Sequence, residues 1–292
     1  AGVVCAGDLP GNLWKFDISA STASGWKVSF GGAPLYIAKD SGNSPQPIVA
    51  APVYVPHPQG GIMLGFVTGR NFTTGDRTDV SEQSIYAVWD NSTVTISSAG
   101  VLTVEDNSGK RITGGRSSLV QQTVDSSVIS TYGARTFYTS SSNPVNYKST
   151  GANPNKRGWY MNFLDSGERG TLNPSLSDAG SDYANFFSSI PAQGTDSNTE
   201  TCSLTSKSEV PFTTTINMIN GAPTLKPYYD NNGGGFTGDE VVTSRVKGQG
   251  KSVTFKNSDS SGTSTTYTVN NPTGVGTKPP QDTGITTGWR ER

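Results

Sequence analysis

Residues 230–240, which read DNNGGGFTGDE, have the spacing of a calcium-binding loop. A loop of the EF-hand type places oxygen ligands at positions 1, 3 and 5, a glycine at 6 and a backbone carbonyl at 7. Counting from the first aspartate, positions 1, 3, 6 and 7 fit, but a glycine occupies position 5 and the acids come slightly early at the end. The sequence therefore predicts a weak Ca²⁺ site or, as the alternative, a plain Gly/Asn turn between strands. The candidate ligands are Asp230, Asn232, Phe236, Asp239 and Glu240.

Machinery for catalysis is sparse in this sequence. His57 is the only histidine, and it lies between Pro56 and Pro58 in what we interpret as a rigid loop. One histidine excludes the usual multi-histidine zinc and iron sites, and no Gly-x-Ser-x-Gly elbow is present to form a hydrolase triad. We expect this histidine to be exposed to solvent, and we expect no enzyme activity.

The chain has two cysteines, Cys5 and Cys202, and the sequence alone does not determine whether they form a disulfide. An even cysteine count in a chain rich in Ser, Thr and Gly suits an exported protein, in which the two could form a disulfide. The alternative is a pair of buried free thiols.

The composition restricts the elements that can hold any site. Of 292 residues, 35 are Gly, 17 Pro, 37 Ser and 35 Thr, while only 15% are charged. These residue types favour turns and strands over helices. The 5 Trp, 11 Tyr and 11 Phe can supply a core, which argues against disorder. The composition therefore predicts an all-β fold.

Charge and hydropathy exclude two kinds of partner. The net charge is −1, and the largest basic groups are the pair Lys156 and Arg157 and the trio Lys110, Arg111 and Arg116. A nucleic-acid-binding protein would normally show a basic face. No apolar run approaches the ~18–20 residues that a membrane span needs. We therefore expect no nucleic-acid partner and no membrane span.

A repeated pattern of apolar strand, turn and aromatic strand ending in aspartate predicts β-hairpins. The first copy covers residues 3–18, the second joins 62–67 to 84–90, and a third, weaker aromatic arm covers 158–165. The terminal aspartates Asp17, Asp90 and Asp165 are 73 and 75 residues apart. Such spacing favours a β-propeller over the alternative, a β-sandwich.

Between and after these arms we expect long loop insertions and a final set of short strands. The loop-like segments are residues 69–82, 139–155, 172–208 and 221–238, and the late strands are residues 240–247, 252–256 and 265–269. The chain opens inside a strand, so we expect it to be part of a longer protein.

Several short motifs bracket the chain from Cys5 to Glu291. They are CAGDLPGNLWKFD at 5–17, PIVAAP at 47–52 followed by HP at 57–58, GFVTGR at 65–70, QSIYAVWD at 83–90, GWY at 158–160, GER at 167–169 and WRE at 289–291. In sequence and in order, these motifs together resemble those of the PilY/PilC family of type IV pilus-associated proteins.

The resemblance implies a modified β-propeller with quinoprotein-like blades and long loop insertions. Residues 1–292 would be part of a single C-terminal β-propeller domain, behind an N-terminal region that is absent here. It implies a non-enzymatic bacterial protein, exported through the periplasm to the pilus tip or cell surface. There it would act with minor pilins in pilus biogenesis and in adhesion to host or abiotic surfaces.

The resemblance also bears on Ca²⁺ and on the cysteines. Members often bind Ca²⁺ in a loop just before the AGDL strand, which here would precede Ala1, so that site is absent or degenerate in this chain. Cys202 matches a family cysteine, whereas Cys5 stands where an aromatic residue is more usual, so the family implies no bond between them.

Two other functions remain as alternatives. Quinone-dependent dehydrogenases share similar blade motifs, because those residues close propeller blades rather than perform chemistry. A glycan-binding fibre or lectin domain would use exposed aromatic residues as stacking platforms. The candidates for that role are Trp26, Trp159, Tyr228 and Tyr229.

Overall fold

The protein is built almost entirely from β-strands, as its composition predicts. The computed structural model describes residues 2–125, 130–132, 135–138, 140–177, 182–192, 209–223, 245–247, 253–258 and 264–269. Within these ranges the helical elements are short, namely α1 Ser29–Gly32 and the 3₁₀ turns η1 Ala23–Gly25, η2 Gly75–Thr78, η3 Ser108–Lys110 and η4 Gly115–Ser118. None of the helices in the described ranges has the length and apolar character needed to cross a membrane.

The first sheet contains the hairpin predicted for residues 3–18, which includes the AGDL motif. Its strands are β1 Val3–Gly7, β2 Asn12–Asp17, β3 Lys27–Val28 and β4 Tyr36–Ile37. Asp8 braces the turn, because its carboxylate accepts hydrogen bonds from the Asn12 backbone amide at 2.7 Å and the Trp14 indole at 2.8 Å. Gly11 has φ +83°, and a Cβ there would lie 2.7 Å from the carbonyl oxygens of Ala38 and Gln46. The motif is thus explained by turn geometry.

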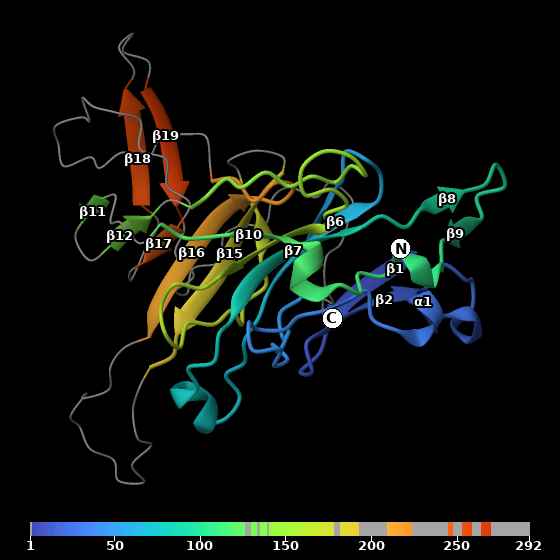
Figure 1. The fold of residues 1–292 in the computed structure, drawn as a ribbon, viewed down its shortest axis with the longest axis horizontal. Helices are drawn as coiled ribbons and strands as arrows, with labels where there is room; N and C mark the ends of the chain where they lie inside the picture. The colour runs from blue at the N-terminus through green and yellow to red at the C-terminus, as the bar shows by residue number, and fades with distance from the viewer. Residues whose placement is uncertain are drawn as a thin grey trace.

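The second sheet is the centre of the molecule (Figure 1). Its strand order is β10 Val120–Gln122, β13 Gly158–Asn162, β7 Ser84–Asp90, β6 Ile62–Val67 and β5 Val53–Pro56. The predicted pairing of β6 with β7 is confirmed, with Leu64 opposite Val88. The third aromatic arm, however, is not a separate repeat, because β13 pairs with β7 and places Gly158 opposite Val88. The spacing between Asp90 and Asp165 therefore does not measure a distance between blades.

The third sheet corrects the expectation of a loop over residues 172–208. It contains β11 Ser130–Tyr132, β12 Arg135–Tyr138, β17 Arg245–Lys247, β16 Val210–Asn217, β15 Tyr183–Ile190 and β14 Ser175–Leu176. Strand β15 buries every second residue, and these are Ala184, Phe186 and Ser188. The period-2 pattern was hidden in the sequence because small and hydroxyl side chains occupy buried positions.

Two further hairpins complete the described fold. Strands β8 Val94–Ile96 and β9 Leu102–Val104 form one, and β18 Val253–Ser258 and β19 Ser264–Val269 form the other (Figure 1). The late strands were predicted as one meander, but β17 pairs with β12 and β16 in the third sheet instead. In the expected loops at 69–82 and 139–155, the described residues form turns and irregular backbone apart from η2 and isolated bridges at Gly69 and Ser140.

The hydrophobic core has two parts, one on each face of the second sheet. Ile85, Ala87 and Trp89 of β7 face one cluster, which also contains residues from β15 and β16. Tyr86 and Val88 face the other cluster, together with Leu13 of the first sheet. All seven residues of β7 are consequently buried. The second sheet is a middle layer, and it needs apolar side chains on both faces.

A buried ion pair joins the first sheet to the second. The Lys15 ammonium on β2 lies 2.6 Å from the Asp90 carboxylate at the end of β7 and also donates to the Ser92 hydroxyl. Both charged side chains are at most 2% exposed. Asp90 additionally accepts a hydrogen bond from the Ser92 amide at 3.0 Å. Charges this deeply buried are tolerated because each is paired and hydrogen-bonded.

We expect Lys15→Met or Asp90→Leu alone to lower the free energy of unfolding by about 3–5 kcal/mol, because each leaves an unpaired buried charge. The double variant should cost less than the two single costs added together. The exposed pair of Lys27 and Asp106 supplies the control, since Lys27→Met should cost at most about 1 kcal/mol. Urea unfolding monitored by tryptophan fluorescence measures all four. Single variants no more costly than the control would contradict this account.

Candidate functional site at the end of strand β7

An aromatic cluster closes the end of β7. The Trp89 and His57 rings stack with centroids 4.2 Å apart, and Tyr147 lies edge-on to both, at 5.4 Å and 4.5 Å respectively. The Trp89 indole donates to the Gly60 carbonyl at 2.7 Å, and the Tyr147 hydroxyl donates to the Ile219 carbonyl. The cluster therefore ties β7 to segments far apart in the sequence.

His57 is buried, contrary to the expectation of an exposed loop histidine. Only 5% of it is exposed, because the chain leaving β5 turns the imidazole onto Trp89. Its Nδ1 accepts from the Gln59 amide at 3.1 Å, while Nε2 is buried without a hydrogen-bond partner among the described residues. Burial lowers the His57 pKa to about 4, so the ring is neutral at physiological pH. Its neighbours are aromatic rings and an amide, an arrangement suited to packing.

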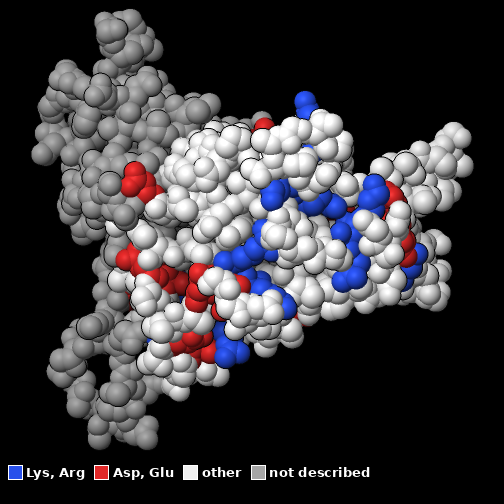
Figure 2. Space-filling model, viewed as in Figure 1, with Lys and Arg blue, Asp and Glu red and all other residues white. Residues whose placement is uncertain are grey.

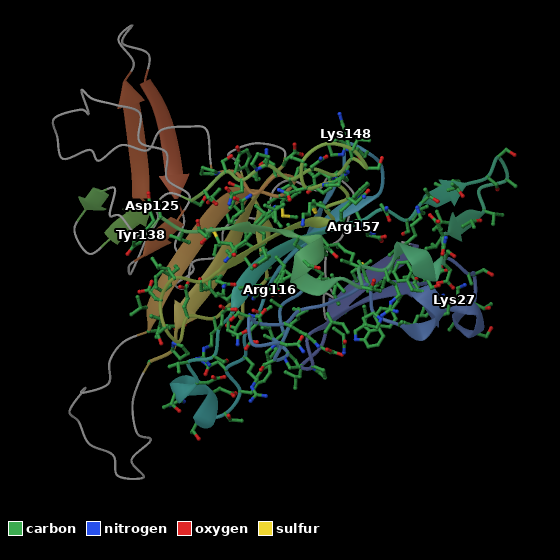
Figure 3. All side chains as sticks on the ribbon, viewed as in Figure 1. Lys27, Arg116, Asp125, Tyr138, Lys148 and Arg157 are labelled. Atoms are coloured by element: carbon green, nitrogen blue, oxygen red, sulfur yellow. The ribbon has the colours of Figure 1, made fainter. Side chains whose placement is uncertain are left out.

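A polar cleft of about 590 Å³ opens beside the aromatic cluster. Trp89 and Tyr147 border it, and amide and hydroxyl side chains contribute much of the remaining wall. Figure 2 shows lysine and arginine atoms extending from the centre to the right of the visible face, and Figure 3 labels Arg157 near the centre and Lys148 at the upper edge. Among the described residues that line the cleft there is no Asp or Glu, whereas four are cationic, namely Arg111, Lys148, Lys156 and Arg157.

Neutral oxygens hold three of these four cations in place. The Arg157 guanidinium donates to the Trp89 carbonyl at 2.8 Å and lies 5.7 Å from the Trp89 ring centroid. Burial lowers the Arg157 pKa and the nearby Asp90 opposes that effect, but a guanidinium stays charged in proteins. Arg111 donates to the Pro34 carbonyl at 2.9 Å, and Lys156 to the Ser117 carbonyl at 2.8 Å.

Two cations outside the cleft serve the fold. Arg116 lies 2.8 Å from Glu82, donates to the Tyr86 hydroxyl at 3.0 Å and stacks 4.5 Å above the Tyr160 ring. Arg169, in the GER motif, donates to four carbonyls, three of them in the 70–79 loop, and fixes that loop. These two residues hold separate segments together.

The predicted metal and disulfide residues are only partly described. Asp230, Asn232, Phe236, Asp239, Glu240 and Cys202 all lie outside the described residues. The weak Ca²⁺ site and the Cys5–Cys202 bond therefore stay predictions. Cys5 lies on β1, opposite Lys15, and burial raises the pKa of its thiol to about 12. In the part of the chain that is described, no three His, Cys, Asp or Glu side chains gather as metal ligands would.

One of the proposed stacking platforms is wrong. Trp159 is fully buried, with its ring edge-on to Phe186 and its indole donating to the Met218 carbonyl at 2.9 Å. Trp26 is 53% exposed, as expected, and Tyr228 and Tyr229 lie outside the described residues.

The cationic cleft was not predicted from the sequence. Arg111 and the pair Lys156 and Arg157 appeared there as small, separate basic groups, and Lys148 as part of a loop insertion. No local pattern links these segments, because the parallel pairing of β10 with β13 brings their flanking loops together.

We expect the His57 ring to make the protein less stable as the pH falls. The folded-state pKa of about 4 lies below the ordinary 6.5, so the unfolded chain binds a proton first. The histidine contribution is complete above about pH 6.5 and declines by up to about 1.4 kcal/mol per unit towards pH 4. Thermal melts of the parent and of His57→Phe from pH 7.5 to 4 measure this. The variant retains the stacking ring and the shared carboxylates, so parallel profiles would refute the assignment.

Comparisons with known proteins agree with this architecture. Residues 1–136 match the family model described as the PilY1 beta-propeller domain. The type IV pilus biogenesis factor PilY1 of Pseudomonas aeruginosa PAO1 is 39% identical over 183 residues, which cover 56% of this chain and 15% of that protein. A PilY1 homologue of Xylella fastidiosa Temecula1 is 30% identical over 256 residues, covering 85% of this chain and 17% of the homologue.

A solved structure extends the similarity over most of the chain. The crystal structure of the P. aeruginosa PilY1 C-terminal domain superposes with a TM-score of 0.63 and 26% identity, covering 90% of this chain and 55% of that domain. The predicted all-β, modified β-propeller class is thereby confirmed. The chain spans about a sixth of the length of these curated relatives. It is a homologue of the type IV pilus biogenesis factor PilY1, and it is similar to about half of the PilY1 C-terminal domain.

Proposed function

We propose that this chain is part of a non-enzymatic, type IV pilus-associated surface protein that acts in pilus biogenesis and in adhesion at the pilus tip. The observation that carries the proposal is its similarity to the PilY1 C-terminal domain over 90% of its length. On this proposal the whole protein is exported through the periplasm. It acts outside the bacterium with minor pilins and with a host or abiotic surface, and residues 1–292 belong to a single C-terminal domain.

The roles of the motif residues support a binding function over a catalytic one. Asp8 braces a turn, Asp90 neutralises Lys15, and His57 packs between aromatic rings. The likeness to quinone-dependent dehydrogenases concerns the same turn-forming residues, so packing accounts for it without shared chemistry. The open polar cleft beside Trp89 is the feature best suited to contact another molecule.

The test uses the full-length protein in its own bacterium. We expect a strain in which residues 1–292 are deleted to lose most surface pili, twitching and attachment, and the corresponding segment of P. aeruginosa PilY1 to restore them in part. We expect His57→Phe to behave like the parent, because a packing ring is preserved while the only histidine is removed. Counting pili by electron microscopy and measuring twitching zones and attached cells gives the readout.

Two results would contradict the proposal. If the deletion strain, with the rest of the protein exported normally, assembled pili, twitched and attached like the parent, this region would have no role in the pilus. If His57→Phe were exported and folded but inactive, the imidazole would have a chemical role and the non-enzymatic assignment would fail.

A further inference from the structure

We infer that the cleft beside Trp89 binds an acidic polysaccharide, whose carboxylate or sulfate groups pair with the four cations of the cleft. The inference names the ligand class for the adhesive role proposed above and to that extent rests on it. The physical argument depends on the charge, the hydrogen-bonding capacity and the shape of the cleft.

The first argument is an imbalance of charge. Cations elsewhere in the described chain are commonly paired with carboxylates, as in Lys15–Asp90, Lys27–Asp106, Arg70–Asp76, Lys110–Glu105 and Arg116–Glu82. None of the four cations of the cleft has a carboxylate within ion-pair distance among the described residues. A chain of net charge −1 thus concentrates uncompensated positive charge in one concave site, which attracts anions.

The second argument is that the donors are held in position. Carbonyl oxygens bind one side of the Arg157 and Arg111 guanidinium groups. Within the described chain, three groups that line the cleft have no hydrogen-bond or ion-pair partner. They are Nη1 of Arg157, both Nη atoms of Arg111 and the ammonium of Lys148. Guanidinium groups fixed in this way recognise carboxylate and sulfate oxygens without a large loss of side-chain entropy.

The third argument is the character of the remaining wall, which favours a sugar. Gln59, Asn91, Asn155, Ser118 and Ser149 supply amide and hydroxyl groups that can bond to sugar hydroxyls. The volume of about 590 Å³ falls within the usual range for small-molecule sites, so it accommodates a short run of sugar units. Nucleic acid is disfavoured because Trp89 is only 7% exposed and offers no open stacking face.

Lys148 is the position to test. Its ammonium has no side-chain partner among the described residues, so replacing it should not disturb the fold. Lys39 is the matched control, because it lies outside the cleft and its ammonium also lacks a carboxylate partner in that part of the chain. This ammonium donates only to the Asn43 side chain, at 3.2 Å. The variants Lys148→Glu and Lys39→Glu make the same change in net charge at two sites.

The experiment measures binding of the full-length secreted protein to immobilised polymers by interferometry, in 50 and 300 mM NaCl. Polygalacturonate supplies carboxylates, heparin supplies sulfates, dextran is the uncharged control, and polyglutamate and single-stranded DNA are competing anions. We expect salt-sensitive binding to polygalacturonate, heparin or both, and none to dextran. Lys148→Glu should weaken it about tenfold or more, and Lys39→Glu by less than about twofold.

The inference is overturned if neither acidic polysaccharide binds, or if dextran binds equally well. Equal losses in the two variants would also overturn it, since they would reflect overall charge. Polyglutamate or DNA binding more tightly than both polysaccharides would indicate another partner class. Pili counted in the same strains separate this result from the proposed function. If neither polysaccharide binds but the deletion strain loses its pili, only the inference about the cleft is refuted. If the deletion strain keeps its pili, the proposed role in the pilus is refuted, whatever the binding measurements show.

Discussion

The buried ion pair between Lys15 and Asp90 is the interaction on which the described structure depends. It connects the first and second sheets, which share the core around Leu13 and Tyr86, and it lies where β7 ends and the loops of the cleft begin. A buried ammonium or carboxylate is very costly without a partner, so the two sheets must pack in a single arrangement that joins these atoms. Asp90 is followed directly by Asn91, which lines the cleft and accepts a hydrogen bond from Arg157 at 3.0 Å.

The charges of the molecule fall into two groups with different consequences. Those inside the fold are compensated, as when Arg116 meets Glu82, or they bond to several carbonyls, as Arg169 does. Those around the cleft are oriented by neutral oxygens but are not neutralised. A charged side chain that is paired with an opposite charge or with carbonyl oxygens holds segments of the chain together. A charged side chain that is not neutralised and that lines a solvent-accessible cleft is available to a ligand. This difference separates the structural motifs from the recognition surface.

The residues that resemble PilY1 motifs and the residues that line the cleft differ in the same way. The motifs that identify the family, such as AGDL and GER, are turns and clamps in this structure, with Asp8 bracing a hairpin and Arg169 fixing a loop. Such residues preserve the scaffold, while the loops around it can vary in what they bind. The identity of 26% over the matched 55% of the PilY1 C-terminal domain is therefore compatible with a shared scaffold and a ligand that differs between relatives.

Local patterns in the sequence were sufficient for the fold class and for several elements. Alternating apolar residues and turn residues predict the β1–β2 and β6–β7 pairs, because strand periodicity and turn geometry depend on neighbours in the chain. The sequence pattern does not predict strand β15, because its buried residues Ala184 and Ser188 are not strongly apolar. They are buried only because other elements pack against them. The prediction that His57 is exposed was wrong for a related reason. A histidine flanked by prolines becomes a core residue only where the fold packs Trp89 and Tyr147 against it.

The cleft depends wholly on tertiary structure. Arg111 and Lys148 are 37 positions apart, and a shared electrostatic field requires closeness in space, which the sheet pairing alone provides.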